Sequence, residues 1–256
     1  MDASDPKQRF SATVDLYAKH RPDYPASAFD AIAERSGVRP PARVLDLGCG
    51  TGISSRALSR FGYEVVGVDP NADMLERARV ESAAANGATP PIEWRVGECT
   101  ATGLAPASVD LIVAAQAFHW FPIEPTVAEC KRVLRSGHPF AALWNRRAKT
   151  AFLDGYEALI RRLSTDYAGL TGVDETLARI SASPSVARSL RCTVVNEQRF
   201  DRDGLRGRAW SSSYVAHGVA DKGGFDRALD ALFDEHASDG SVSFAYDVEI
   251  LVAWPR

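Results

Sequence analysis

The chain has 256 residues, of which 45% are hydrophobic and 25% charged, which is ordinary for a globular protein long enough to bury a full core. Its net charge of −3 disfavours nucleic acid as a partner. No apolar run approaches the ~20 residues of a membrane span, and the polar first ten residues do not fit a secretory signal. Four cysteines without C-x-x-C spacing disfavour disulfides and bound metal. We therefore expect a cytoplasmic protein with no metal and no membrane or nucleic-acid partner.

The first 40 residues are predicted to be mainly helical. Phe29, Ile32 and Ala33 recur at helical spacing, and the Gly- and Pro-containing stretch 37–41 ends the pattern. We expect residues 1–40 to form an N-terminal helical lid.

Residues 41–147 alternate between short apolar runs and helical patterns. Such alternation favours a parallel sheet with helices on both faces. The strands are expected at 42–47, 63–68, 92–96, 109–115 and 139–144, and the helices at 53–61, 71–85 and 125–135.

The rhythm changes after residue 147. Residues 148–190 favour helices and are too long for a loop, so we expect a helical cap insertion there. Residues 191–256 are expected to complete the sheet, with strands at 194–200 and 242–254 and helices at 205–214 and 225–236. The predicted fold is a single α/β domain: a Rossmann-like, seven-stranded, mostly parallel sheet with helices on both faces and a helical cap.

A glycine-rich turn follows the first expected strand. Gly48, Gly50 and Gly52 occupy alternate positions, which allows a tight turn and lets a ligand approach the backbone. Asp69, at the end of the next strand, lies 19 positions after Gly50. A carboxylate there can accept hydrogen bonds from two ribose hydroxyls. The pattern therefore predicts a cofactor that contains a nucleoside.

Two cofactors compete for this turn. An NAD enzyme normally has G-x-G-x-x-G, whereas this turn has G-x-G-x-G and is preceded by Asp46, which would repel a pyrophosphate. S-adenosylmethionine (SAM) has no phosphate and carries a sulfonium and an ammonium group, so a nearby carboxylate favours it. The residues favour SAM over NAD. A turn that binds nothing is a third interpretation, which the position of Asp69 disfavours.

Four segments carry a resemblance to a known family: LDLGCGTG at 45–52, VVGVDPNADMLERAR at 65–79, the stretch 97–121 that ends in QAFHWF, and RVLRSGHPFAALWNRR at 132–147. The chain resembles class I SAM-dependent methyltransferases over residues 10–147. The most similar branch is the small-molecule group that includes trans-aconitate methyltransferase-like proteins, whose opening element is matched by Tyr17, Arg21-Pro22 and Tyr24-Pro25. The resemblance implies an antiparallel last strand.

The resemblance also implies a cofactor site. Asp46 and the glycine turn would hold the methionine part of SAM, and Asp69 the ribose. Met74 would pack near the adenine, and Glu98 would accept a bond from its amino group. An N-terminal helix would close over the cofactor, with Arg21 as a partner for its carboxylate. The expected cofactor-binding residues are Tyr17, Arg21, Asp46, Gly48, Cys49, Gly50, Thr51, Gly52, Asp69, Pro70, Met74, Glu98, Cys99, Gln116, Ala117 and Phe118.

His119 is the candidate general base, because it follows the fourth strand at the edge of the sheet where ligands bind. An ordinary histidine pKa of about 6.5 suits proton abstraction. Hydroxyl and carbon acceptors usually need a base, whereas carboxylates and tertiary amines do not. The alternative is that His119 only shapes the pocket among its aromatic neighbours.

The acceptor is expected to contact Trp120, Trp144, Arg146 and Tyr214. Arg146 or Arg147 could pair with an acidic acceptor, the alternative being a solvated pair after a strand. The predicted function is methylation of a small molecule by O-, N- or C-transfer, with S-adenosylhomocysteine (SAH) as product, by a monomer or homodimer. Two alternatives stay open: an enzyme of cyclase type that uses SAM without methyl transfer, and a protein that senses SAM.

Overall fold

The computed structural model describes residues 22–84, 91–167 and 172–256. The chain divides into two compact units. We call the first the sheet unit; it comprises Asp23–Asn145, Gly172–Val194 and Val248–Arg256. We call the second the helical unit. Its described residues lie within Arg146–Thr171 and Val195–Asp247, and Pro22 also belongs to it. Tyr17 and Arg21, expected in a lid over the cofactor, lie outside the described residues.

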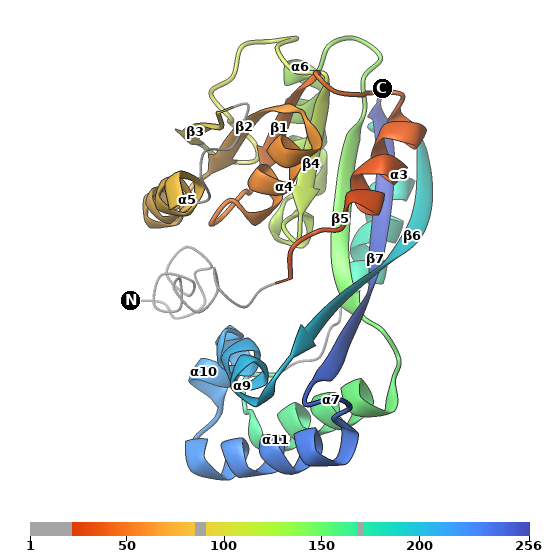
Figure 1. Cartoon of the computed structure of the whole chain (residues 1–256). Coiled ribbons are helices and arrows are strands. Elements are labelled where there is room, and N and C mark those ends of the chain that lie inside the picture. The colour runs from red at the N-terminus through yellow and green to blue at the C-terminus, as the bar shows by residue number, and fades with distance from the viewer. Residues whose placement is uncertain (1–21, 85–90, 168–171) are drawn as a thin grey trace. The chain divides into compact units, whose positions relative to one another are not determined.

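A seven-stranded sheet has the order β3-β2-β1-β4-β5-β7-β6 (Figure 1). β1 is parallel to β2 and β4, β2 to β3, and β4 to β5. β7 runs from the helical unit into the sheet unit, opposite to β5 and β6, so the sheet is mixed. The predicted seven-stranded, mostly parallel sheet is confirmed. The strands are β1 (Arg43–Leu47), β2 (Glu64–Asp69), β3 (Glu93–Val96), β4 (Leu111–Ala115), β5 (Phe140–Arg147), β6 (Val186–Phe200) and β7 (Val242–Pro255).

Two apolar clusters lie on opposite faces of the sheet. In β4, Leu111 and Val113 belong to one cluster and Ile112 to the other, as expected for a parallel strand that is buried on both sides. The first cluster includes helices α3 (Ala26–Ser36) and α4 (Ile53–Phe61), and the second includes α6 (Ile123–Val133) and α8 (Val173–Ala182). Helix α5 (Ala72–Ala84) packs along β2 and β3.

The helical unit has its own core, built around Phe244 and Tyr156. Its helices are α7 (Ala151–Leu163), α9 (Arg202–Trp210), α10 (Ser213–Gly218) and α11 (Lys222–His236). Side chains of Thr150, Asp201 and Asp221 cap the first turns of α7, α9 and α11 by accepting backbone N–H groups.

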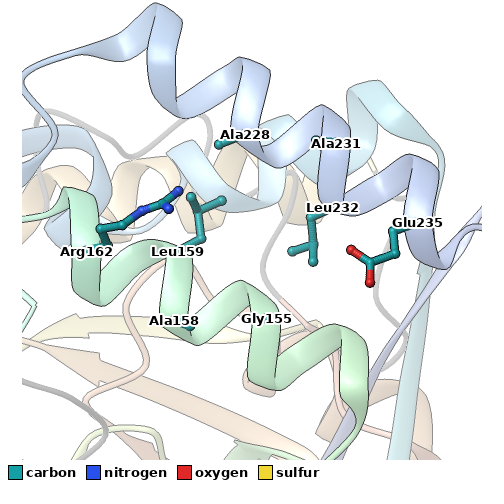
Figure 2. Close-up of a pocket in the computed structure, with 8 residues that line it drawn as sticks. All are labelled: Gly155, Ala158, Leu159, Arg162, Ala228, Ala231, Leu232 and Glu235. Atoms are coloured by element: carbon teal, nitrogen blue, oxygen red, sulfur yellow. The ribbon is translucent and has the colours of Figure 1, made fainter.

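A groove of about 370 Å³ lies between α7 and α11 (Figure 2). Small and apolar residues line most of it, with Arg162 and Glu235 as its charged members. None of the site residues expected from the sequence lines this groove.

The segment 148–190, which was expected to form one helical cap, is divided between the two units. Helix α7 belongs to the helical unit, whereas α8 lies in the core of the sheet unit through Leu177 and Ile180. Strand β6 begins at Val186, eight residues before the expected start. Its first half contains exposed charged residues and no apolar run, so periodicity did not reveal it. The helix expected at 205–214 is likewise two helices, α9 and α10.

No helix in the described part of the chain is long and apolar enough to cross a membrane.

Candidate cofactor site

The glycine turn after β1 is fastened to the end of β2. The backbone N–H groups of Gly48 and Cys49 donate to the carbonyl oxygen of Val68, at 2.8 and 3.1 Å. The N–H of Gly50 donates to Oδ2 of Asp69, at 2.9 Å. These bonds hold the turn and Asp69 side by side at the carboxyl edge of the sheet, where ligands bind in open α/β folds.

All three alternating glycines have positive φ: +73° at Gly48, +53° at Gly50 and +77° at Gly52. A Cβ at Gly48 would lie 2.8 Å from Ala117, and one at Gly52 would lie 2.5 Å from the Trp94 ring. A Cβ at Gly50 would meet nothing within 4 Å. Gly50 is therefore required by its backbone conformation, and the space beside it is open enough for a ligand to approach.

Asp46, the residue two before the turn, is fully buried. Its Oδ2 accepts hydrogen bonds from the hydroxyls of Ser54, at 2.7 Å, and Ser55, at 2.5 Å. Its Oδ1 and the buried hydroxyl of Thr51 have no hydrogen-bond partner in the described protein. Burial raises the pKa of Asp46 to about 6. A buried carboxylate with an unused oxygen can accept a bond from a cationic ligand.

Asp69 ends β2 and is also largely buried. Oδ1 accepts the N–H of Asn71 and Oδ2 that of Gly50, both at 2.9 Å. A carboxylate oxygen has two lone pairs and can accept more than one hydrogen bond. The carbonyl of Asp69 accepts the N–H of Gly97, at 3.2 Å. This bond brings the segment 97–101, which holds Glu98 and Cys99, to the same edge.

Nearby, the first turn of α5 holds Met74, which is buried, after Pro70, which is exposed. Glu98 is exposed and pairs with Ala101 in a tight antiparallel bridge. The structure thus brings the turn, Asp69, Met74 and the segment 97–101 to one edge of the sheet unit.

The segment after β4 completes this edge. Gln116 has a φ of +56°, which is uncommon for a residue other than glycine. Its backbone N–H donates to Leu143, at 2.8 Å, and its side-chain amide to the carbonyl of Asn145, at 3.3 Å. Ala117 is the residue that a Cβ at Gly48 would meet, and Phe118 is buried in the core. Ala117 therefore lies against the glycine turn, between Gln116 and Phe118.

His119 lies in a 3₁₀ turn at Phe118–Trp120. Its Nδ1 accepts a hydrogen bond from Nε1 of the buried Trp144, at 3.1 Å. Because Trp144 can only donate, the neutral imidazole must carry its hydrogen on Nε2. Burial lowers the pKa of His119 to about 4, although part of the side chain is exposed, and the Trp144 N–H independently opposes protonation of Nδ1. The ring is therefore neutral near pH 7, with Nε2 as a donor.

The residues expected at the acceptor are divided between the two units. Trp120, which is 53% exposed, and the buried Trp144 belong to the sheet unit. Arg146 and Tyr214 belong to the helical unit. No group of three or more His, Cys, Asp or Glu side chains within the described ranges could hold a metal ion.

Sequence reasoning missed four residues of this edge. Ser54 and Ser55 hold Asp46, Trp94 packs over Gly52, and Asn71 bonds Asp69. Two serines in the first turn of α4 were a usable signal, because the glycine turn brings the start of this helix back to the end of β1, where Asp46 lies. Nothing in the sequence identified Trp94.

Comparisons with known proteins agree with this geometry. Residues 45–141 match the family described as a methyltransferase domain. An uncharacterized methyltransferase of Mycobacterium tuberculosis is 36% identical over 138 residues, which make up 54% of this chain and 52% of that protein. The chain thus spans about half the length of the curated relatives that it matches.

Solved structures extend the likeness over most of the chain. A protein of Anaeromyxobacter dehalogenans, provisionally assigned as a type II methyltransferase, is 28% identical with a TM-score of 0.69, and the match covers 91% of this chain and 97% of that one. The [4+2]-cyclase SpnF has a TM-score of 0.55 at 15% identity, covering 97% and 95%, and shares the fold alone. Residues 45–141 thus match a methyltransferase domain, and in its motifs and fold the chain is similar to class I SAM-dependent methyltransferases.

Proposed function

We propose that this protein transfers a methyl group from SAM to a small-molecule acceptor. The observation that carries the proposal is the open side of the glycine turn next to a buried carboxylate oxygen that has no partner among the described residues. A cation fits this position and a pyrophosphate does not, because Asp46 would repel it. When bound, SAM would supply a methyl group made electrophilic by the positively charged sulfur.

The residues of the sheet edge suit the parts of this cofactor. Asp46 and the Thr51 hydroxyl would bind the methionine end, and the Asp69 carboxylate beside the turn would accept bonds from the ribose. Met74 would contact the adenine, with Glu98 and Cys99 beside it. Gln116–Phe118 would close the side nearest Gly48. The pairing of charges, the hydrogen-bond acceptors and the open space all support SAM over NAD.

His119 would face the acceptor as a hydrogen-bond donor in this arrangement. Its role as a base stays a prediction that the observed tautomer disfavours, because Nδ1 already accepts the Trp144 N–H. A neutral Nε2–H can orient an acceptor oxygen without removing a proton. This favours acceptors, such as carboxylates, that need no base.

Calorimetric titration with SAM, SAH and NAD tests the cofactor. We expect micromolar binding of SAM and SAH and none of NAD. Asp69→Asn should weaken SAH binding at least tenfold, whereas Asp73→Asn, a change at an exposed neighbour in the first turn of α5, should not. A folded protein that binds neither SAM nor SAH would refute the proposal.

The alternatives need a second measurement. The chain shares its fold with the [4+2]-cyclase SpnF, so the fold alone does not distinguish methyl transfer from a reaction of cyclase type. Incubation with SAM labelled in the methyl group, together with a panel of small acceptors, distinguishes them: labelled product means methyl transfer. Tight SAM binding with no labelled product would instead favour the cyclase or sensor alternatives.

A further inference from the structure

Two arginines are buried in the helical unit. Arg208, on α9, is 4% exposed, and 6% of the Arg147 side chain, at the end of β5, is exposed. A guanidinium stays charged at every pH that the protein meets. A buried charge is costly unless an opposite charge or several hydrogen bonds compensate it.

The partners of Arg208 are neutral. Nε donates to the Tyr246 hydroxyl at 3.3 Å, and Nη1 donates to the Ser212 hydroxyl at 3.1 Å. The guanidinium carbon lies 5.1 Å from the centroid of the Phe244 ring. Among the residues that the structure describes, Arg208 forms no ion pair, and its Nη2 donates no hydrogen bond. Its charge is therefore not balanced.

Arg147 pairs with one carboxylate, that of Glu157, which also pairs with Arg161. Its Nη2 lies 3.5 Å from Oε2 of Glu157 and donates to the Tyr167 hydroxyl at 2.5 Å. Glu157 also accepts two bonds from Arg161, at 3.1 and 2.6 Å. The buried Nε of Arg147 has no hydrogen-bond partner within the described ranges. One carboxylate thus serves two arginines, while Arg208 has none.

Tyr156 links the two buried arginines. Its ring centroid is 5.5 Å from the guanidinium of Arg147, and its ring meets Phe244, which lies under Arg208, edge-on at 5.2 Å. The buried Tyr156 hydroxyl has no partner in the described parts of the chain. Burial raises its pKa, so the hydroxyl remains a hydrogen-bond donor. Donors on Arg208, Arg147 and Tyr156 therefore lack acceptors in one small region.

We propose that Arg208, Arg147 and Tyr156 bind a carboxylate group of a small organic molecule. A guanidinium matches the two oxygens of a carboxylate, and a monoanion balances the one arginine that lacks a counter-charge. Under the proposed function, on which this assignment of the ligand rests, the molecule is the methyl acceptor and the carboxylate is the group that anchors it.

Calorimetry with simple anions tests the site. Acetate, succinate and citrate are titrated at constant ionic strength, with SAH present, against acetamide and succinamide as neutral analogues. We expect at least one carboxylate to bind, its amide not to bind, and Arg208→Met and Tyr156→Phe to weaken binding at least tenfold. Arg162→Met, at an exposed arginine of α7, should bind like the wild type.

Three results would overturn the proposal. The first is that the wild type binds no carboxylate. The second is that Arg208→Met and Tyr156→Phe bind the carboxylate as tightly as the wild type does. The third is that inorganic phosphate binds as tightly as the best carboxylate. Wild-type protein that binds SAH but no carboxylate would leave the proposed function standing while this inference fails. Failure to bind SAH would instead contradict the proposed function.

Melting curves separate binding from folding. Tyr156→Phe removes only a hydroxyl without a partner, so its melting midpoint should equal or exceed that of the wild type. The same carboxylate should raise the midpoint of the wild type and not that of Tyr156→Phe. A variant that melts well below the wild type, together with a wild type that no carboxylate stabilises, would assign the cluster a purely structural role and overturn the proposal.

Discussion

Asp46 is a carboxylate whose ionisation opposes folding. Burial raises its pKa from 3.8 to about 6, a difference of about 2 units, or roughly 3 kcal/mol. Because the folded-state pKa is the higher one, the folded chain binds more protons than the unfolded chain between these two values. Stability from this residue is therefore complete below about pH 4 and falls as the pH rises through 6.

Asp46→Asn should remove this pH dependence. Between pH 4 and pH 7 the wild type should lose about 2–3 kcal/mol of unfolding free energy that the variant keeps, because asparagine does not ionise. Urea unfolding at pH 4.5 and pH 7.5 measures the difference. Asp154→Asn, at the solvent-exposed start of α7, is the control and should follow the wild type. Parallel wild-type and Asp46→Asn curves would show that Asp46 does not titrate in this range.

The same residue predicts how SAM binding depends on pH. A cationic ligand binds the ionised carboxylate better, so the wild-type Kd for SAM should rise as the pH falls from 7 to 5. Asp46→Asn should bind SAM more weakly and without this dependence. Calorimetric titration at pH 5, 6 and 7 measures both. A wild-type Kd that stays constant over this range would contradict a contact between Asp46 and the cation.

Trp144→Phe should raise the pKa of His119. The substitution keeps an aromatic ring but removes the N–H that occupies Nδ1. Burial lowers the pKa of His119 to about 4, and removal of the Trp144 N–H should raise the pKa above that value because Nδ1 can then be protonated; an NMR titration of the imidazole follows the change. The depressed pKa also means that the folded wild type loses stability as the pH falls from about 6.5 towards 4, since the unfolded chain gains the proton first. An unchanged pKa in the variant would assign the shift to burial alone.

At the scale of the element, the glycine turn predicts opposite effects of two alanines. Gly52→Ala places a Cβ 2.5 Å from Trp94 at a φ of +77°, and should cost about 3 kcal/mol of stability. Gly50→Ala meets no neighbour and should cost only about 1 kcal/mol for its left-handed backbone.

The loss of SAH affinity should be larger in Gly50→Ala than the small loss of stability in that variant suggests. The methyl group of Gly50→Ala would occupy the open side of the turn, so SAH affinity should fall at least tenfold in a protein that remains well folded. Urea unfolding and calorimetry on both variants supply the two rankings. Wild-type SAH affinity in Gly50→Ala would place the ligand elsewhere.

The elements that sequence patterns predicted best are those buried on both sides. β4 is an uninterrupted apolar run, β1 is apolar apart from Arg43 and Asp46, and α4 ends at a glycine, so their positions could be expected within one or two residues. β6 could not, because its first half is mostly exposed, includes Arg188 and Arg191, and contains no apolar run. The boundary between α9 and α10 contains only serines, which do not mark a break clearly.

The same contrast holds for the site. The glycine spacing and Asp69 are local signals, and they correctly indicated one edge of one sheet. The bond between Trp144 and His119 joins residues 25 positions apart. The cluster of Arg208, Arg147 and Tyr156 combines residues of α9, β5 and α7, with Phe244 and Tyr246 of β7 beside them. Contacts between residues so far apart in the sequence depend on tertiary packing, which a single sequence does not reveal.

At the scale of the whole molecule, all the proposed cofactor residues that the structure describes belong to the sheet unit. SAH should therefore slow amide hydrogen exchange in the segments 46–52, 69–75 and 97–102 more than in α9 and α11. Exchange measured with and without SAH, followed by peptide mass analysis, tests this. Equal protection of α9 and α11 would show that the cofactor also orders the helical unit.

Three strands pass from one unit into the other without interruption. β5, β6 and β7 each have residues in both units. A recombination event that exchanged the helical unit between relatives would have to join the chains inside a strand each time, where register and face must both be kept. Sequence change in the helical unit should therefore arise by substitution within its existing helices and not by exchange of the whole unit. Protein engineers who seek chimaeras should redesign side chains of α7, α9 and α11 in place.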